Sequence, residues 1–88
     1  MNSPTYKWIK IEKLQSINPG LQHDGYKTEG VFVFPPLEIG QSVRILRYEG
    51  GKPKMYITTQ IINLTPTTFQ TINSIYKYTI TEKEYENL

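Results

Sequence analysis

The sequence predicts an all-β protein, a small and mostly antiparallel barrel or curled sheet of five to six short strands. Its 88 residues suffice for one domain, and a chain of this size buries only about 60–65% of its unfolded surface. It contains no Ala, the best helix former, and is rich in Ile, Thr, Tyr, Val and Phe, which favour pleated strands. Six Gly and six Pro lie between the apolar runs as turn signals.

The first predicted element is a strand over residues 7–13, where apolar and charged side chains alternate. The same stretch places Trp8, Ile11 and Leu14 near one face of a helix, with Pro4 in its first turn. The β-branched content favours the strand.

A long loop is predicted over residues 15–30, because Asn18-Pro19-Gly20 and His23-Asp24-Gly25 are both turn signals. Gly30 is expected to open a short strand at 31–34. Pro35-Pro36 ends this strand, since proline has no N–H to donate to a neighbouring strand.

The C-terminal half is predicted to be a meander. Its expected strands are 42–48, 55–64, 68–72 and 75–80, with a Gly-Gly hairpin loop at 49–54. Neither face of 55–64 is cleanly apolar, so this strand is expected to bend and serve two parts of a barrel. Residues 81–88 are expected to form a helical turn or an acidic tail, which gives a barrel domain over 1–81 and a tail over 82–88.

Two short runs in this meander resemble known proteins. They are Ile57-Thr58-Thr59-Gln60-Ile61-Ile62 and Phe69-Gln70-Thr71-Ile72-Asn73-Ser74-Ile75-Tyr76. A Thr-rich strand, a Pro turn and F-x-T-x-N-S-x-Y resemble the closing meander of small phage and mobile-element proteins, and are similar to the last strands of SH3-like barrels. The resemblance covers about twenty residues and implies an SH3-like barrel with a short 3₁₀ turn at Asn73-Ser74. It implies no catalytic or binding residues.

Charge is distributed unevenly along the chain. Ten Lys and Arg against eight Asp and Glu give +2 overall, divided into +4 over residues 1–81 and −2 over 82–88. The stretch 44–54 holds a local +3. This is a modest basic patch rather than the dense stripe of a strong nucleic-acid binder.

The candidate binding site is the hairpin over residues 44–56, where basic and aromatic side chains gather. Its candidate residues are Arg44, Arg47, Tyr48, Lys52, Lys54 and Tyr56. Basic groups contact phosphates and aromatic faces stack on bases, so the hairpin is the predicted site for a nucleic acid or nucleotide. The alternative is a solvated hairpin in which Tyr48 and Tyr56 form a cross-strand pair.

The residue types argue against catalysis. The chain has no Cys and one His, and no Ser lies in a nucleophile motif, so a hydrolase centred on His23-Asp24 is the least favoured reading. One His with scattered carboxylates does not form a metal-ligand pattern, and Gly50-Gly51 is not followed by a phosphate-binding helix. We therefore expect no catalytic residues, no metal and no cofactor.

A non-enzymatic binding module is the function class that remains. The preferred partner is a protein or a second copy of the chain, joined through open strand edges and exposed Tyr side chains, as in a phage-derived inhibitor or adaptor. Nucleic acid or nucleotide is the alternative partner. Met1-Asn2-Ser3-Pro4 does not resemble a signal peptide and no apolar run reaches about 20 residues, so a cytoplasmic protein that does not enter membranes is expected.

Overall fold

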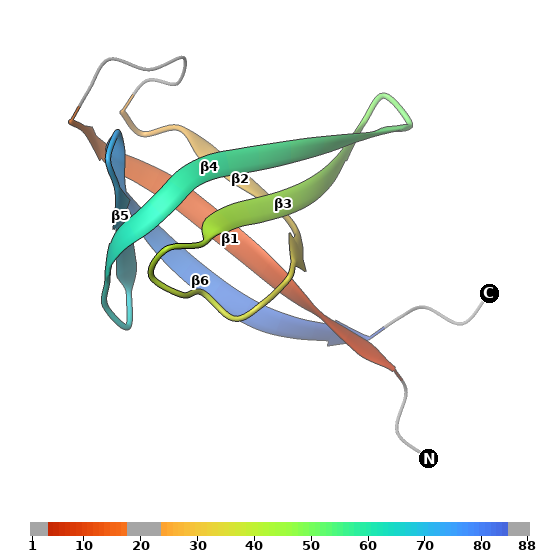
Figure 1. Ribbon diagram of the computed structural model, residues 1–88. Helices are drawn as coiled ribbons and strands as arrows, with labels where there is room; N and C mark the ends of the chain where they lie inside the picture. The colour runs from red at the N-terminus through yellow and green to blue at the C-terminus, as the bar shows by residue number, and fades with distance from the viewer. Residues whose placement is uncertain (1–3, 18–23, 85–88) are drawn as a thin grey trace.

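The computed structural model describes residues 4–17 and 24–84, and it confirms the predicted all-β barrel. Six antiparallel strands follow one another around a closed barrel, and the last strand pairs with the first (Figure 1). They are β1 (Thr5–Ser16), β2 (Lys27–Val33), β3 (Ser42–Glu49), β4 (Lys52–Leu64), β5 (Thr68–Thr71) and β6 (Ser74–Glu84). The first segment is therefore a strand and not a helix.

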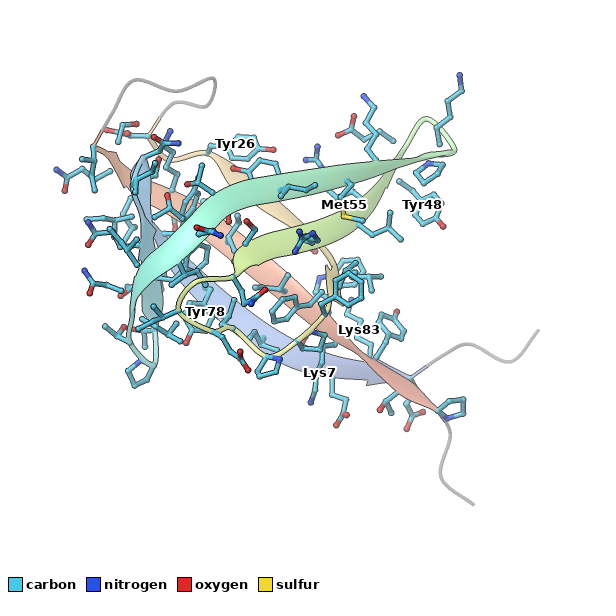
Figure 2. The ribbon with its side chains drawn as sticks, in the orientation of Figure 1. Lys7, Tyr26, Tyr48, Met55, Tyr78 and Lys83 are labelled. Carbon is cyan, nitrogen blue, oxygen red and sulfur yellow. The ribbon has the colours of Figure 1, made fainter. Side chains whose placement is uncertain are left out.

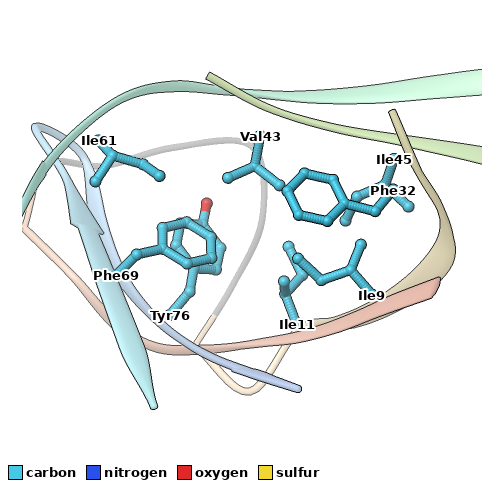
Figure 3. Close-up of a cluster of buried hydrophobic side chains, with 8 residues drawn as sticks. All are labelled: Ile9, Ile11, Phe32, Val43, Ile45, Ile61, Phe69 and Tyr76. Atoms are coloured by element: carbon cyan, nitrogen blue, oxygen red, sulfur yellow. The ribbon is translucent and has the colours of Figure 1, made fainter. Parts of the chain in front are cut away.

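The core draws on every strand. Its buried side chains are Ile9, Ile11, Phe32, Val43, Ile45, Ile61, Phe69 and Tyr76 (Figure 3). In β1 and β3, which each contribute two core residues, these lie at alternate positions, because successive side chains point to opposite faces of a sheet. The rings of Phe69 and Tyr76 stack with centroids 4.9 Å apart, so the predicted C-terminal meander contributes two of the three aromatic residues of this core.

Strand β4 bends as predicted, through irregularities in its pairing with both neighbours. At the first of these, Val43 N–H donates to the Thr58 hydroxyl at 2.9 Å, and that hydroxyl donates to the Thr59 carbonyl at 2.7 Å. The Thr58 side chain thus satisfies a backbone donor that the bulge leaves without a ladder partner.

The predicted loop over 15–30 is wrong at both ends. Strand β1 continues to Ser16, and β2 begins at Lys27, where it already pairs with Glu12. Gly30 lies inside β2 rather than opening it. The reason is packing: a Cβ at Gly30 would overlap the carbonyl oxygen of Leu46, so glycine marks a close approach of β3 and not a strand end.

Three smaller expectations differ from the structure: the length of the hairpin loop, the 3₁₀ turn and the boundary of the tail. The hairpin loop is only Gly50-Gly51, both with positive φ, because residues 52–54 already pair with β3. The break between β5 and β6 is a bend at residues 72–73 and not a 3₁₀ turn, and there the Thr71 hydroxyl accepts from the amides of Asn73 and Ser74.

The predicted tail boundary falls within β6, which continues through Glu84 alongside Thr5. Here Glu82 accepts a hydrogen bond from the Thr5 hydroxyl at 2.9 Å and lies 3.4 Å from the Lys7 ammonium. These two contacts, the hydrogen bond first, lower the pKa of Glu82. Residues 85–88 lie outside the described residues.

Candidate functional site

The six predicted site residues are divided between the two faces of the β3–β4 hairpin. Side chains of Arg47, Lys54 and Tyr56 share the face of the core residue Ile45, because Arg47 pairs with Lys54 and Ile45 pairs with Tyr56. Arg44 and Tyr48 occupy the opposite, outer face. Lys52 lies at the exposed tip, paired with Glu49. The hairpin therefore does not bring the six together on one surface.

Arg47 is the centre of a polar cluster at one end of the barrel interior. Its Nη1 donates to the Tyr26 hydroxyl at 3.0 Å and to the Thr28 hydroxyl at 2.8 Å, and its Nη2 lies 3.1 Å from Glu49 Oε1. Its guanidinium also lies over the Tyr56 ring at 5.9 Å. Arg47 Nε is buried and has no hydrogen-bond partner among the described residues. The geometry gives Arg47 a structural role and leaves it little capacity to bind phosphate.

Lys54 is also occupied. Its ammonium lies 3.0 Å from Glu49 Oε2, so Glu49 bridges Lys54 and Arg47 with its two carboxylate oxygens. The hydrogen bond from Lys54, then the charges of Lys54 and Arg47, lower the pKa of Glu49. Of the four basic residues in the predicted site, only Arg44 and Lys52 have no ion pair among the described residues.

Tyr56 belongs to the interior cluster rather than to a stacking surface. Its ring stacks with Tyr26 at 5.8 Å, and its hydroxyl lies 3.3 Å from the Tyr76 hydroxyl. Burial, and secondly the hydrogen bond with Tyr76, raise the pKa of Tyr56 well above its ordinary value.

We expect this raised pKa to make the barrel less stable in alkali. Above pH about 10, tyrosines of the unfolded chain ionise while Tyr56 in the barrel stays protonated, so the free energy of the unfolded state falls relative to that of the folded state. Stability from this group is complete below that pH and is lost as pH rises towards the pKa in the folded state. Urea unfolding across this range should show the loss, and Tyr56→Phe should reduce it whereas Tyr48→Phe should not. An equal slope in both variants would contradict the prediction.

The outer face of the hairpin continues a row of apolar side chains across four strands. Trp8 of β1 pairs with Val31 of β2, Val31 with Leu46 of β3, and Leu46 with Met55 of β4. Residues directly opposite one another point to the same face, so the four side chains form one row. Beside it Ile57 is 55% exposed. Sequence reasoning missed this row, because its members come from four separate runs.

Two exposed aromatic residues flank this row. Tyr48, in β3 of the hairpin, is 69% exposed and lies near Met55 (Figure 2). Phe34, which directly follows β2, is 76% exposed, with the Arg44 guanidinium 6.0 Å from its ring centre.

A groove opens on this surface where β2 and β3 separate. Strands β2 and β3 pair with each other only between Val31–Val33 and Arg44–Leu46. The part of β2 before Val31 pairs with β1 alone, and the part of β3 after Leu46 pairs with β4 alone. The groove between them, here called the β2–β3 groove, has a volume of about 550 Å³. It is lined by Tyr6, Trp8, Thr28, Glu29, Val31, Leu46, Arg47, Tyr48 and Glu49.

The charged side chains in the lining of the β2–β3 groove are Glu29, Glu49 and Arg47. Glu29 and Glu49 have side chains 50% and 47% exposed, and each has a basic partner, Lys10 at 3.7 Å from Glu29 and Lys54 at 3.0 Å from Glu49. The Lys83 ammonium lies 3.9 Å from the centre of the Trp8 ring, a cation–π contact at the groove wall. The groove thus combines aromatic faces with carboxylates.

Of the pair considered for catalysis, His23-Asp24, only Asp24 lies among the described residues. His23 lies outside the described residues, and the Asp24 carboxylate accepts hydrogen bonds from the Ser16 amide and hydroxyl at 2.9 and 2.8 Å. Among residues 4–17 and 24–84, no three His, Asp or Glu side chains are grouped to hold a metal ion. The same residues contain no helix long and apolar enough to cross a membrane.

Comparison of the chain with protein-family models, with curated proteins and with solved structures finds no match. The fold and the groove therefore define a class only: a small antiparallel β-barrel with a groove lined by aromatic and charged side chains.

Proposed function

We propose that the protein is a non-enzymatic protein-interaction module that holds an extended segment of a partner protein in the β2–β3 groove. The observation that supports this most is the lining by three aromatic residues, Tyr6, Trp8 and Tyr48. Tyr and Trp are enriched among the side chains that dominate binding energy at protein interfaces.

The backbone around the groove supports an extended ligand. Residues 27–29 of β2 and 47–49 of β3 face the groove, and among the described residues no strand pairs with them on that side. An extended peptide can add its own backbone hydrogen bonds to such edges, and side-chain pockets then give specificity.

Charge favours a protein segment over a nucleic acid. Glu29 and Glu49 line the groove beside Arg47, and the cations that contact these carboxylates are not free to bind a phosphate. The basic residues expected to bind phosphate are divided between two faces, and Arg47 and Lys54 already pair with Glu49. Nucleic-acid binding is therefore the weaker proposal.

Photo-crosslinking from the groove tests the proposed function. A photoreactive phenylalanine in place of Tyr48 should crosslink one protein partner in the producing cells. The same group in place of Phe34, equally exposed but outside the groove lining, should not. With the partner purified, Tyr48→Ala should weaken binding by about tenfold or more, as at an interface hot spot.

Two outcomes would overturn the proposal. Equal crosslinking from both positions would show that the groove is not the binding surface. Crosslinking of Tyr48 to RNA or DNA instead of protein would favour the nucleic-acid alternative, and binding would then weaken steeply with salt.

A further inference from the structure

Strand β4 has a long edge that no other strand covers. Strand β3 runs along β4 from Lys52 to Gln60, whereas β5 begins to pair only at Ile61. The side of β4 away from β3, here called the open edge and spanning Lys52–Gln60, has no strand partner within the described residues. Figure 1 shows the β3–β4 hairpin reaching away from the remainder of the barrel. Such an edge is a template for pairing with another chain.

The hairpin geometry identifies which residues serve the open edge. A two-residue loop closes on a hydrogen-bonded pair, here Glu49 with Lys52, and pairing alternates from there. Pro53, Met55 and Ile57 therefore direct their backbone polar groups away from β3. The sequence agrees, because Pro53 has no N–H to give to β3.

We infer that two copies of the chain associate through their open edges, antiparallel about a two-fold axis at Tyr56. In this register Met55 of each copy lies opposite Ile57 of the other, and both positions have their N–H and C=O directed to the edge. The two Met55–Ile57 pairs supply four backbone hydrogen bonds. They also place together side chains that are 46% and 55% exposed in the single chain.

The charges of the edge fit a second copy. The same register puts Lys54 opposite Thr58 and Lys52 opposite Gln60, so no lysine faces a lysine. Such an arrangement is self-complementary, which a two-fold interface requires.

Other registers are poorer. Moving the axis to Met55 places Pro53 opposite Ile57 and removes two donors. Moving it to Ile57 places the bulge residues Thr58 and Thr59 opposite Tyr56 and Met55, at the centre of the ladder. In the inferred register Pro53 and the bulge lie opposite one another, outside the central hydrogen-bonded pairs of Met55 with Ile57.

This interface is separate from the β2–β3 groove. The groove lies on the β2 side of β3, and the open edge lies beyond β4. Pairing of two copies leaves both grooves open and makes the assembly bivalent. The inference therefore does not depend on the proposed function.

Engineered disulfides test the register, because the natural chain has no cysteine. Cα atoms of a hydrogen-bonded antiparallel pair lie about 5.5 Å apart, within the range of a disulfide. Oxidising a mixture of differently tagged Met55→Cys and Ile57→Cys chains should give the mixed crosslinked dimer as the main product. Each variant oxidised alone should give little dimer. Equal yields from single variants and mixture, or no dimer at all, would overturn the inferred register.

Light scattering tests the association itself. The natural chain should show twice the mass of one chain at high concentration. Ile57→Lys should raise the dissociation constant at least tenfold, since it places a desolvated charge at the interface. The control Ile62→Lys changes an isoleucine 42% exposed on the part of β4 that already lies beside β5, and should remain dimeric.

Three results separate this inference from the proposed function. Tyr48→Ala should lose binding of the groove partner but keep the dimer. Ile57→Lys should lose the dimer but keep binding of the groove partner. A natural chain that stays monomeric at every concentration overturns the inference and leaves the groove untouched. Equal dissociation of Ile57→Lys and Ile62→Lys would also overturn it.

Discussion

Gly30→Val should remove most of the stability of the barrel. A side chain at position 30 meets the Leu46 carbonyl oxygen and a methyl group of Ile45, and the first of these is backbone that cannot rotate away. Strand β3 must then move off β2 at the point where Val31 and Leu46 begin their pairing. Such overpacking should cost about 3 kcal/mol or more, against a total stability of about 4–13 kcal/mol for a chain of this length. Urea unfolding followed by Trp8 fluorescence measures the loss.

Gly25→Ala provides the matched control. Gly25 has a φ of +86° but nothing within 4 Å of an added Cβ, so its alanine variant carries only backbone strain. We expect a loss of about 1 kcal/mol there. Equal losses at Gly25 and Gly30 would show that the close approach of β3 to β2 contributes nothing beyond glycine's conformational freedom.

The same glycine explains why the start of β2 was mispredicted. A glycine after turn signals is ordinarily read as the boundary of a strand, since it weakens strand interiors. Here it sits within β2 because another backbone passes over it, a fact that depends on contacts between β2 and β3. Alternation within single strands was a more reliable guide to which side chains are buried. Ile9 and Ile11, and likewise Val43 and Ile45, lie in the core as the alternation indicates, because the two-residue period of a strand is a local property.

The candidate site was only partly predictable for a related reason. Alternation along β3 places Arg47 with Val43 and Ile45, but its partners Tyr26 and Thr28 lie in a stretch predicted to be a loop. The groove depends on pairing across three strands, in which Trp8, Val31 and Leu46 become neighbours through register. Register between distant strands is set by the whole sheet and is not visible in any one segment.

Arg47→Ala should be nearly as damaging as the change at Gly30. The side chain is only 23% exposed. Its removal leaves the Tyr26 and Thr28 hydroxyls without the charged donor of their hydrogen bonds, and leaves Glu49 without one of its two ion-pair partners. Hydrogen bonds to charged groups are worth about 1.5–3 kcal/mol, and buried groups that lose their partner add a desolvation cost. We expect a loss of about 2–4 kcal/mol in the free energy of unfolding. Urea unfolding in low and moderate salt should show the loss in both, since a partly buried pair is screened weakly.

Arg44→Ala is the control from the same strand. Arg44 lies on the outer face, where its guanidinium stacks on Phe34, so its removal should cost about 0.5–1 kcal/mol. Arg47→Lys should recover only part of the lost stability, because one ammonium cannot bond two hydroxyls and a carboxylate with the geometry of a guanidinium. Equal, small losses at Arg44 and Arg47 would mean that Arg47 is free to meet a phosphate, and the nucleic-acid alternative would regain its principal cation. The predicted difference between these two arginines thus decides whether the basic hairpin is a binding surface or part of the framework that shapes the groove.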